Sequence, residues 1–367
     1  MIVLTLVGFF LTMLTALFFI RWGRDHAERY KLDLPQRFHI GAVPRLGGLA
    51  IMGGMFFSWI LVAGASSFGL NLNVKGSWPL VWPWLVVVLP SVLGGAYEDI
   101  TQRLSVIYRL LLTAISAGFA CWLLGISVPR IDIPQIDLWM KDVPILGITL
   151  AMIAICGLPH AFNIIDGYNG LAGTVAVMIS LALVHVALQL GDRQLAAMLV
   201  CMAAATVGFL VWNYPRGLIF AGDGGAYLWG VVIAVASIQL VQRHPSVSPW
   251  FPVLLLIYPV WETLFSIYRK TIRGTSPGVA DALHFHQLIY RRIVRSVFHD
   301  DASRQMLMRN NRTSPWLWGF ALLTLVPAVL FWDNSLVLII CCALFVIIYI
   351  AVYLMLIRFK VPNWLRR

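Results

Sequence analysis

A short stretch between two apolar runs carries the residue types that could do chemistry. Within Phe162–Ala172, the polar residues Asn163, Asp166 and Asn169 recur at intervals of three beside several glycines. At a helix end this spacing puts the three side chains on nearly one face, and the glycines let backbone or ligand come close. An ionisable group at the end of a membrane helix indicates a functional site, because hydrocarbon around a charge is costly. A hairpin loop made of turn residues is the alternative interpretation.

Two other segments place carboxylates at the ends of apolar runs. Glu98 and Asp99 are adjacent, and Asp223 lies in the glycine-rich turn Phe220–Gly225 before an apolar run. Free N–H groups in such a turn can face a phosphate while the carboxylate holds a cation. Mg²⁺ prefers one or two carboxylates with substrate phosphates and water. The pattern predicts a hard-cation site with an anionic ligand, while a tight helix hairpin is the alternative reading of the turn alone.

Imidazole and guanidinium groups stand in two further polar segments. His39 and Arg45 precede an apolar run, and His284 and His286 lie in a long basic segment. Alternate histidines could bind zinc, but no third His or Cys lies nearby, so phosphate contacts fit the pair better. Histidines that are only solvated in a loop remain the alternative.

The elements that must position these residues are membrane helices. Sixty per cent of the residues are apolar and 12% are charged, about half the charged share of a soluble domain. We predict an all-α polytopic membrane protein with residues 1–367 as one domain, a retained first helix and no signal peptide. The predicted spans are 2–20, 46–65, 81–97, 106–125, 144–162, 171–190, 194–212, 224–241, 250–268, 315–331 and 335–357.

Cysteines and basic residues complete the picture. All five cysteines lie in apolar runs without metal-ligand spacing, so we expect free thiols and no disulfide. The 27 Lys and Arg residues fall mostly on one side of the predicted membrane, which the positive-inside rule makes cytoplasmic. The N-terminus is then outside and the C-terminus inside. The basic face suits anionic membrane lipids, and no soluble module for nucleic acid is present. The five exceptions are Lys75, Arg130, Lys141, Arg193 and Arg243.

This topology brings the polar segments to one active face, formed by the loops 21–45, 98–105, 163–170, 213–223 and 269–314. Their motifs and order resemble those of the polyprenyl-phosphate N-acetylhexosamine-1-phosphate transferases, a superfamily with initiators of O-antigen synthesis and the phospho-MurNAc-pentapeptide translocase. The resemblance runs from about Arg37 to Arg292. The motif segments that carry it are His39 with Pro44–Gly48, Gly95–Asp99 with Arg109, Asn163–Gly170, Phe220–Gly225 and His284–Gln287.

The departures from the family pattern concern single positions. Glu98 stands where the family usually has Asp, Ile107 where a basic residue is common, and Ala226 where Ser is common. Gln287 replaces a third histidine. Asn169 stands where the translocase branch favours Asp. Together these favour the O-antigen or capsule initiators over the translocase.

The resemblance implies transfer of an N-acetylamino-sugar 1-phosphate from a UDP-sugar to undecaprenyl phosphate, releasing UMP. It implies a Mg²⁺-dependent enzyme, with Mn²⁺ as the alternative ion, on the cytoplasmic face of the bacterial inner membrane. Lipopolysaccharide or O-antigen synthesis is the implied pathway, and a homodimer is an open alternative. Direct displacement and a covalent carboxylate intermediate both stay open.

The resemblance also assigns roles to residues. The implied catalytic residues are Glu98, Asp99, Asp166 and Asp223, with Asp223 and Asp99 as metal ligands. The implied substrate-binding residues are His39, Arg45, Arg109, Asn163, Asn169, His284 and His286.

A secondary transporter of an anionic solute is the competing hypothesis, since transporters also carry charged residues among membrane helices. Two features argue against it. The charged groups gather at one face instead of the midplane, apart from Glu262, which the family resemblance makes a structural acid. No internal repeat is evident.

Overall fold

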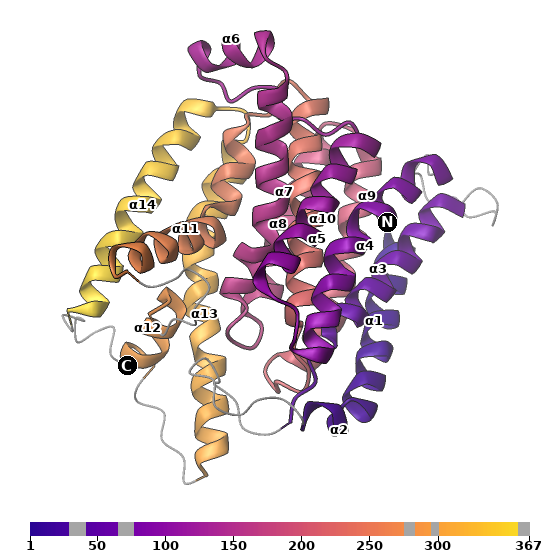
Figure 1. The fold of residues 1–367 in the computed structure, drawn as a ribbon, viewed down its shortest axis with the longest axis vertical. Coiled ribbons are helices and arrows are strands. Elements are labelled where there is room, and N and C mark those ends of the chain that lie inside the picture. The colour runs from indigo at the N-terminus through magenta and orange to yellow at the C-terminus, as the bar shows by residue number, and fades with distance from the viewer. Residues whose placement is uncertain (29–41, 65–76, 275–282, 295–300, 359–367) are drawn as a thin grey trace.

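The computed structural model describes residues 1–28, 42–64, 77–274, 283–294 and 301–358 (Figure 1). Over these ranges the protein contains helices and no strands, and eleven of the helices are long and apolar enough to cross a membrane. The predicted all-α class and the eleven spans are confirmed. The spanning helices are α1 (Ile2–Trp22), α3 (Gly47–Gly64), α4 (Trp78–Thr101), α5 (Val106–Leu123), α7 (Ile145–Ile165), α8 (Leu171–Gln189), α9 (Arg193–Asn213), α10 (Gly222–Arg243), α11 (Trp250–Ile272), α13 (Ala302–Leu330) and α14 (Ser335–Ile357).

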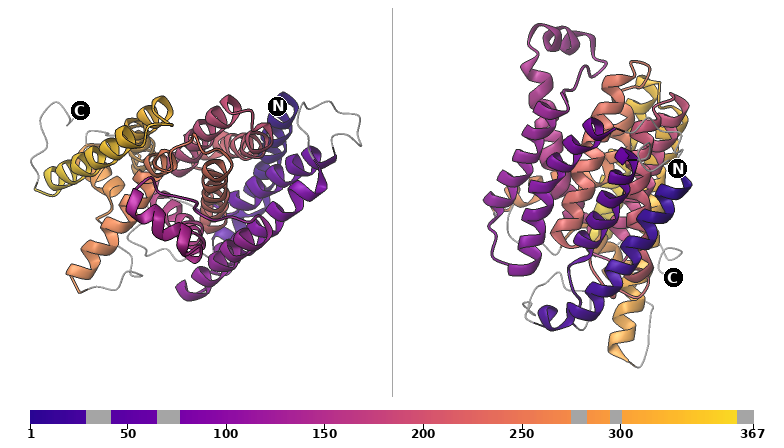
Figure 2. Two further views of the ribbon diagram at one scale, coloured as in Figure 1. Left: turned by 90° about the horizontal axis from the view of Figure 1, so that it is seen from above. Right: turned by 90° about the vertical axis from the view of Figure 1, so that its right-hand side faces the viewer.

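Helix α10 is the centre of the bundle. Its whole apolar stretch is buried inside the protein, and it packs against α3, α4, α7 and α8. Helices α1 and α3 lie on one flank and α14 on the other, as Figure 1 and the view from above in Figure 2 show. Glycines of α10, among them Gly225 and Gly230, let the backbones of neighbouring helices come close, which suits α10 to the central position.

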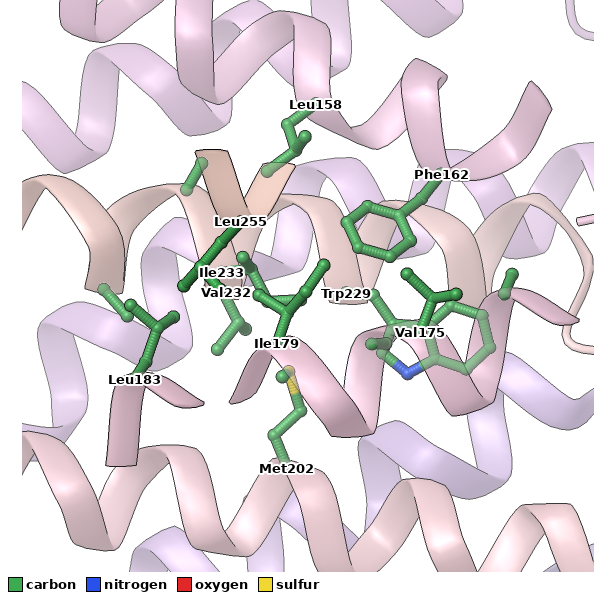
Figure 3. Packing of buried hydrophobic residues seen from close by; sticks show 14 of the residues in the cluster. Leu158, Phe162, Val175, Ile179, Leu183, Met202, Trp229, Val232, Ile233 and Leu255 are labelled. Atoms are coloured by element: carbon green, nitrogen blue, oxygen red, sulfur yellow. The ribbon is translucent and has the colours of Figure 1, made fainter. Parts of the chain in front are cut away.

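The interior is packed by large side chains from several helices. Trp229 of α10 lies beside Phe162 of α7 and Val175 of α8 (Figure 3). The indole Nε1 of Trp229 donates to the Thr206 hydroxyl oxygen at 2.9 Å, so its polar atom is satisfied within the core. Dense packing of this kind holds side chains in single rotamers and makes the core sensitive to volume changes.

Helices α7 and α10 approach closely because small residues stand at their crossing. A Cβ atom built on Gly230 would lie 2.3 Å from the backbone N and Cα atoms of Pro159. Small residues at such crossings let helix backbones meet in membrane proteins. The close contact fixes the end of α7 relative to the start of α10.

Four helices occupy segments that were predicted as loops. The predicted loop 269–314 contains α12 (Phe285–Arg292) and the first part of α13, which starts at Ala302 and not near residue 315. Asp301 caps α13 by accepting from the backbone N–H of Ser303 at 2.8 Å, so polar residues extend the helix beyond the apolar span. The short helix α6 (Pro134–Asp142) lies at the opposite end of the bundle, and α2 (Arg24–Ala27) follows α1.

The described motif residues lie at one end of the bundle. We call the end where α4 and α7 finish and α10 begins the motif end; α12 lies there too, and α6 lies at the other end (Figure 1). The compartment that each end faces stays a prediction from the basic residues.

Labelling can test the predicted orientation. Asp142→Cys in α6 and Arg304→Cys in α13 should report opposite ends, in a background without the five native cysteines. We expect a membrane-impermeant reagent to label position 142 in intact cells and position 304 only after the inner face is opened, because the basic end should face the cytoplasm. Labelling of both positions from one side would contradict the eleven-span topology.

The crossing of α7 and α10 gives a stability prediction. Gly230→Ala forces a methyl group against the Pro159 backbone, and overpacking of this kind costs about 1–3 kcal/mol. Gly157→Ala in α7 is the matched control, since its added Cβ would meet nothing within 4 Å. Thermal unfolding in one detergent should show a loss for the first variant and none for the second. Equal stability of the two variants would mean that the crossing is loose.

Candidate active site

Asp99 joins the end of α4 to the start of α10. Its side chain accepts hydrogen bonds from the backbone N–H groups of Asp223 and Gly224, both at 2.9 Å, and the residue is buried. The first N–H groups of a helix have no partner within that helix. The carboxylate of Asp99 therefore supplies acceptors that α10 needs inside the bundle, and it fixes two of the predicted catalytic acids next to each other.

Asp223 is the meeting point of three other helices and a tyrosine. Its Oδ2 atom accepts from Nη1 of Arg109 in α5 at 2.8 Å and from the Tyr227 hydroxyl at 3.2 Å. Its Oδ1 atom accepts from Nδ2 of Asn163 at the end of α7 at 2.7 Å. The structure thus brings together Asp99, Asp223, Arg109 and Asn163, which are far apart in the sequence.

Glycine residues make this approach of backbones possible. Gly222 has a φ of +70°, and a Cβ atom there would lie 2.4 Å from the carboxylate oxygens of Asp99. A Cβ on Gly48 would lie 2.2 Å from the backbone nitrogen of Gly225, and one on Gly95 would lie 2.5 Å from that of Gly224. The glycines of three predicted motifs are thus required by close contact between α3, α4 and the start of α10.

The segment before α3 is tied to the segment before α10 by backbone hydrogen bonds. Phe220 N–H donates to the Pro44 carbonyl, and Gly47 and Gly48 donate to the Phe220 and Ala221 carbonyls, each at 2.9 Å. Arg45 lies within this pairing and acts electrostatically on the acidic cluster. The other predicted ligand from this region, His39, lies outside the described residues.

Glu98 has a different partner from Asp99. Its Oε2 atom accepts from the backbone N–H of Leu104 at 2.7 Å, across the turn that links α4 to α5. The charges of Arg109, Asp223 and Arg45 all act on this carboxylate. The extra methylene of Glu, relative to the usual Asp, thus reaches the loop backbone, while the group stays within the field of the cluster.

Asp166 lies just after α7, and its charge is disfavoured by its neighbours. Burial, followed by the negative charge of Asp223, raises the pKa of the Asp166 carboxyl from 3.8 to about 7, against an opposing effect of Arg45. Like charges close together make each other harder to ionise. A cation or a protonated group at this point would relieve the repulsion, so the cluster is suited to holding one.

The two predicted histidines lie on α12, at the same end of the bundle. Their rings are parallel, with centroids 5.4 Å apart, and both side chains are buried. A Cβ atom on Gly167 would lie 2.9 Å from Nε2 of His286, so this ring lies against the loop that follows Asp166. Burial and the neighbouring His284 lower the pKa of His286 to about 3, which keeps its imidazole neutral. Neutral imidazole can both donate and accept a hydrogen bond.

Asn169 serves mainly to anchor the loop. Its backbone N–H donates to the Asn310 side chain at 2.8 Å, its amide donates to that of Asn311 at 3.0 Å, and its carbonyl accepts from Ser314 at 2.6 Å. These partners all belong to α13. The predicted role of Asn169 as a substrate ligand is untested, and the contacts show how the loop is held.

Two residues at the site were missed by sequence reasoning. Tyr227 bonds to Asp223 from one turn along the same helix, a spacing of four that the sequence displays. His160 in α7 meets the Thr113 hydroxyl at 3.2 Å, and its ring packs on the edge of Tyr227 at 5.1 Å between centroids. An imidazole in an apolar run was the available signal.

The cluster fits a divalent metal in its donor chemistry. Among the described residues no group of three or more His, Cys, Asp or Glu side chains is arranged to hold a metal ion. Mg²⁺ does not need such a cage, because substrate phosphates and water complete its shell. The side chain of Asp223 is 15% exposed and has lone pairs left beyond its present hydrogen bonds. The residues are therefore compatible with an ion held jointly with a phosphate.

Fold and site together define a polytopic membrane protein with a cluster of acidic, basic and amide side chains at one end of its helix bundle. Residues 81–241 match the model of glycosyl transferase family 4, and this segment holds α4 to α10 with the Asp99 and Asp223 pair. The chain is similar to curated transferases of the kind that its motifs resemble.

Three curated relatives are named as polyprenyl-phosphate N-acetylglucosamine 1-phosphate transferases. A probable undecaprenyl-phosphate N-acetylglucosaminyl 1-phosphate transferase of Bacillus subtilis is 26% identical over 76% of this chain and 75% of its own length. An undecaprenyl-phosphate alpha-N-acetylglucosaminyl 1-phosphate transferase of Thermotoga maritima is 25% identical, over 78% and 80%. A decaprenyl-phosphate N-acetylglucosaminephosphotransferase of Mycobacterium tuberculosis is 26% identical, over 71% and 70%.

The raised pKa of Asp166 predicts a pH-dependent stability. The folded state keeps this proton to about pH 7 and an ordinary aspartate loses it near 3.8, so ionisation of Asp166 removes stability as the pH rises through that window. Asp166→Asn should therefore raise the melting temperature of the ligand-free protein at pH 8 and leave it near wild type at pH 4. The exposed Asp142→Asn at the other end is the control. A gain from Asp166→Asn that is equal at both pH values would contradict the assignment.

Proposed function

We propose that this protein transfers an N-acetylamino-sugar 1-phosphate from a UDP-sugar to a polyprenyl phosphate, giving a polyprenyl-diphosphate-sugar and UMP. The observation that carries the proposal is the Asp99–Asp223 pair at the start of α10, with Arg109 and Asn163 on Asp223. The named activities of the relatives support it. A transporter has no such support, and the carboxylates gather at one end of the bundle instead of its middle.

The proposed reaction exchanges one diphosphate bond for another. An oxygen of the polyprenyl phosphate forms a bond to the β-phosphorus of the UDP-sugar, and the bond from that phosphorus to the bridging oxygen breaks. The leaving group is UMP, which takes both electrons of the broken bond. Both reactants are anions, so catalysis consists mainly of positioning and of neutralising charge.

The chain supplies cationic and neutral donors for these anions. Arg109 is paired with Asp223, from which its guanidinium could turn toward a phosphate, and the charge of Arg45 acts on the same acidic cluster. His284 and His286 would hold the diphosphate from the side of the Gly167 loop. Asp166, with its pKa of about 7, can hold or release a proton near neutral pH.

Asp223 and Asp99 would hold Mg²⁺. When bound, the ion would neutralise charge on the diphosphate. Asn163 then keeps one Asp223 oxygen oriented through its 2.7 Å hydrogen bond, and Asp99 keeps the start of α10 in place.

The proposal extends to location and pathway. We place the motif end on the cytoplasmic face of a bacterial inner membrane, because the basic residues gather there in the predicted topology. The departures at Glu98, Asn169 and Gln287 favour a role in starting O-antigen or another surface polysaccharide over the translocase branch.

The bond that breaks can be tested directly. Purified protein with UDP-N-acetylglucosamine, Mg²⁺ and undecaprenyl phosphate should release UMP and form a lipid diphosphate sugar, and labelled UMP should exchange back into the UDP-sugar because the bond energies nearly balance. Asp223→Asn should lower turnover on the order of a thousandfold while the protein still folds. Asp333→Asn is the matched control, since Asp333 lies between α13 and α14, close in the chain to Ser335, which bonds to Asp132 beside α6 at the opposite end of the bundle.

Other outcomes would overturn the proposal. Release of UDP, with the sugar joined through a single phosphate, would make the protein a different kind of glycosyltransferase. Movement of an anion across vesicles without chemical change would support the transporter. Turnover of Asp223→Asn within tenfold of wild type would put the metal on other carboxylates.

A further inference from the structure

A fully buried acid in the membrane-spanning part of α11 is not explained by the acidic cluster. Glu262 is 1% exposed and lies in a helix whose neighbouring residues are mostly apolar. A charge in this position is costly unless it is paired and hydrogen-bonded. The hydrogen-bond partners of Glu262 therefore indicate its role.

Three donors from two other helices converge on this carboxylate. The Tyr349 hydroxyl of α14 donates to Oε2 at 2.6 Å, and the Phe285 backbone N–H donates to Oε1 at 3.2 Å. Nδ1 of His284 lies 3.0 Å from the same Oε1 atom. Because a carboxylate can only accept, this contact requires a proton on Nδ1 of His284.

The His284 ring has two further contacts. Its side chain takes part in the capping box of α12 with Gln287, and its ring lies parallel to that of His286, with centroids 5.4 Å apart. His286 in turn touches Gly167 and meets the Tyr168 ring at 5.5 Å between centroids. The chain of contacts thus runs from Glu262 through two imidazoles to the loop that follows Asp166.

A second clamp holds the same segment from α11 and α14. Nη1 of Arg269 donates to the Leu283 carbonyl at 2.7 Å and to the Tyr353 hydroxyl at 2.5 Å. Gln287 accepts from the His284 backbone N–H at 3.3 Å, so the residue that replaces a third histidine closes the first turn of α12. Arg269 and Gln287 therefore hold the start of α12 in addition to Glu262. Glu262 is not the only residue that fixes this backbone, so its carboxylate can have a further role.

We infer that Glu262 is a positioning residue for the transfer reaction: it holds the proton of His284 on Nδ1 and thereby presents Nε2 of His284, with His286 behind it, to the phosphate groups of the substrate. The inference rests on the proposed transferase function. A buried carboxylate that sets the tautomer and orientation of an imidazole is an established device in enzymes, and its loss can cost orders of magnitude in rate. Here it connects α11 and α14, outside the matched residues 81–241, to the site.

Glu262→Gln separates charge from shape. The Phe285 N–H keeps the amide oxygen of Gln toward His284, and the amide nitrogen can donate to the Tyr349 hydroxyl, which can accept. The network then keeps its geometry, but the neutral amide oxygen holds the His284 proton more weakly than the charged carboxylate does. We expect kcat to fall on the order of 10–100-fold with a smaller change in KM. Thr263→Val is the matched control, because it removes a hydroxyl from the next residue of α11 and should leave turnover near wild type.

The loss of turnover in Glu262→Gln should also depend on the presence of His284. In a His284→Ala background, which lowers turnover by itself, Glu262→Gln should add little further loss, because the positioned ring is gone. If Glu262 served only to stabilise the fold, Glu262→Gln would reduce turnover by the same factor with and without His284.

A spectroscopic measurement needs no activity. ¹⁵N-histidine NMR of the purified protein, with the His284 signals assigned by their loss in His284→Gln, should show a protonated Nδ1 in the wild type. An unprotonated Nδ1, or full turnover of Glu262→Gln, would overturn the inference. If the wild type itself releases no UMP while Nδ1 is protonated, the proposed function fails and the Glu262–His284 contact stands.

Discussion

The start of α10 poses the main physical problem of this fold. The apolar stretch of this helix is enclosed by other helices, and its first backbone N–H groups have no partner within the helix. Asp99 supplies the missing acceptors through its contacts with Asp223 and Gly224. The solution places one carboxylate against the residue that bears another, so a requirement of the fold and the geometry of the site are met by the same hydrogen bonds.

This arrangement concentrates negative charge at the motif end, since the charge of Asp223 also acts on Asp166 and Glu98. Arg109 offsets part of the negative charge by pairing with Asp223, while burial and then the charge of Asp223 raise the pKa of Asp166. A site with this imbalance favours an arriving cation, and with the cation it can accept an anionic substrate. The same groups would repel a diphosphate that came without one.

Much of this was readable in the sequence, and the reasons are physical. The spans followed from long apolar runs, and α10 agreed within a few residues because its polar ends, Asp223 and Arg243, mark them. Because successive spans cross the membrane in opposite directions, the order of the spans predicted that the motif loops lie at one end. The α13 extension was not predicted, because hydropathy does not detect the polar turns that Asp301 caps. The partners of Glu262 and Tyr227 were not predicted either, since they depend on which helices pack together.

The site forms where two parts of the chain meet. The loop after Asp166 is anchored by α13 through Asn169, and Gly170 N–H is held by the Asn213 side chain at 2.7 Å from the end of α9. Contacts from both sides leave the loop few alternative conformations, so the ring of His286 meets a rigid surface at Gly167. The acids come from the α4–α10 part and the imidazoles from α12. Any change that shifts α13 or α14 against α7 must therefore alter the spacing between the acids and imidazoles that we propose bind cation and phosphate, even when it lies far from both.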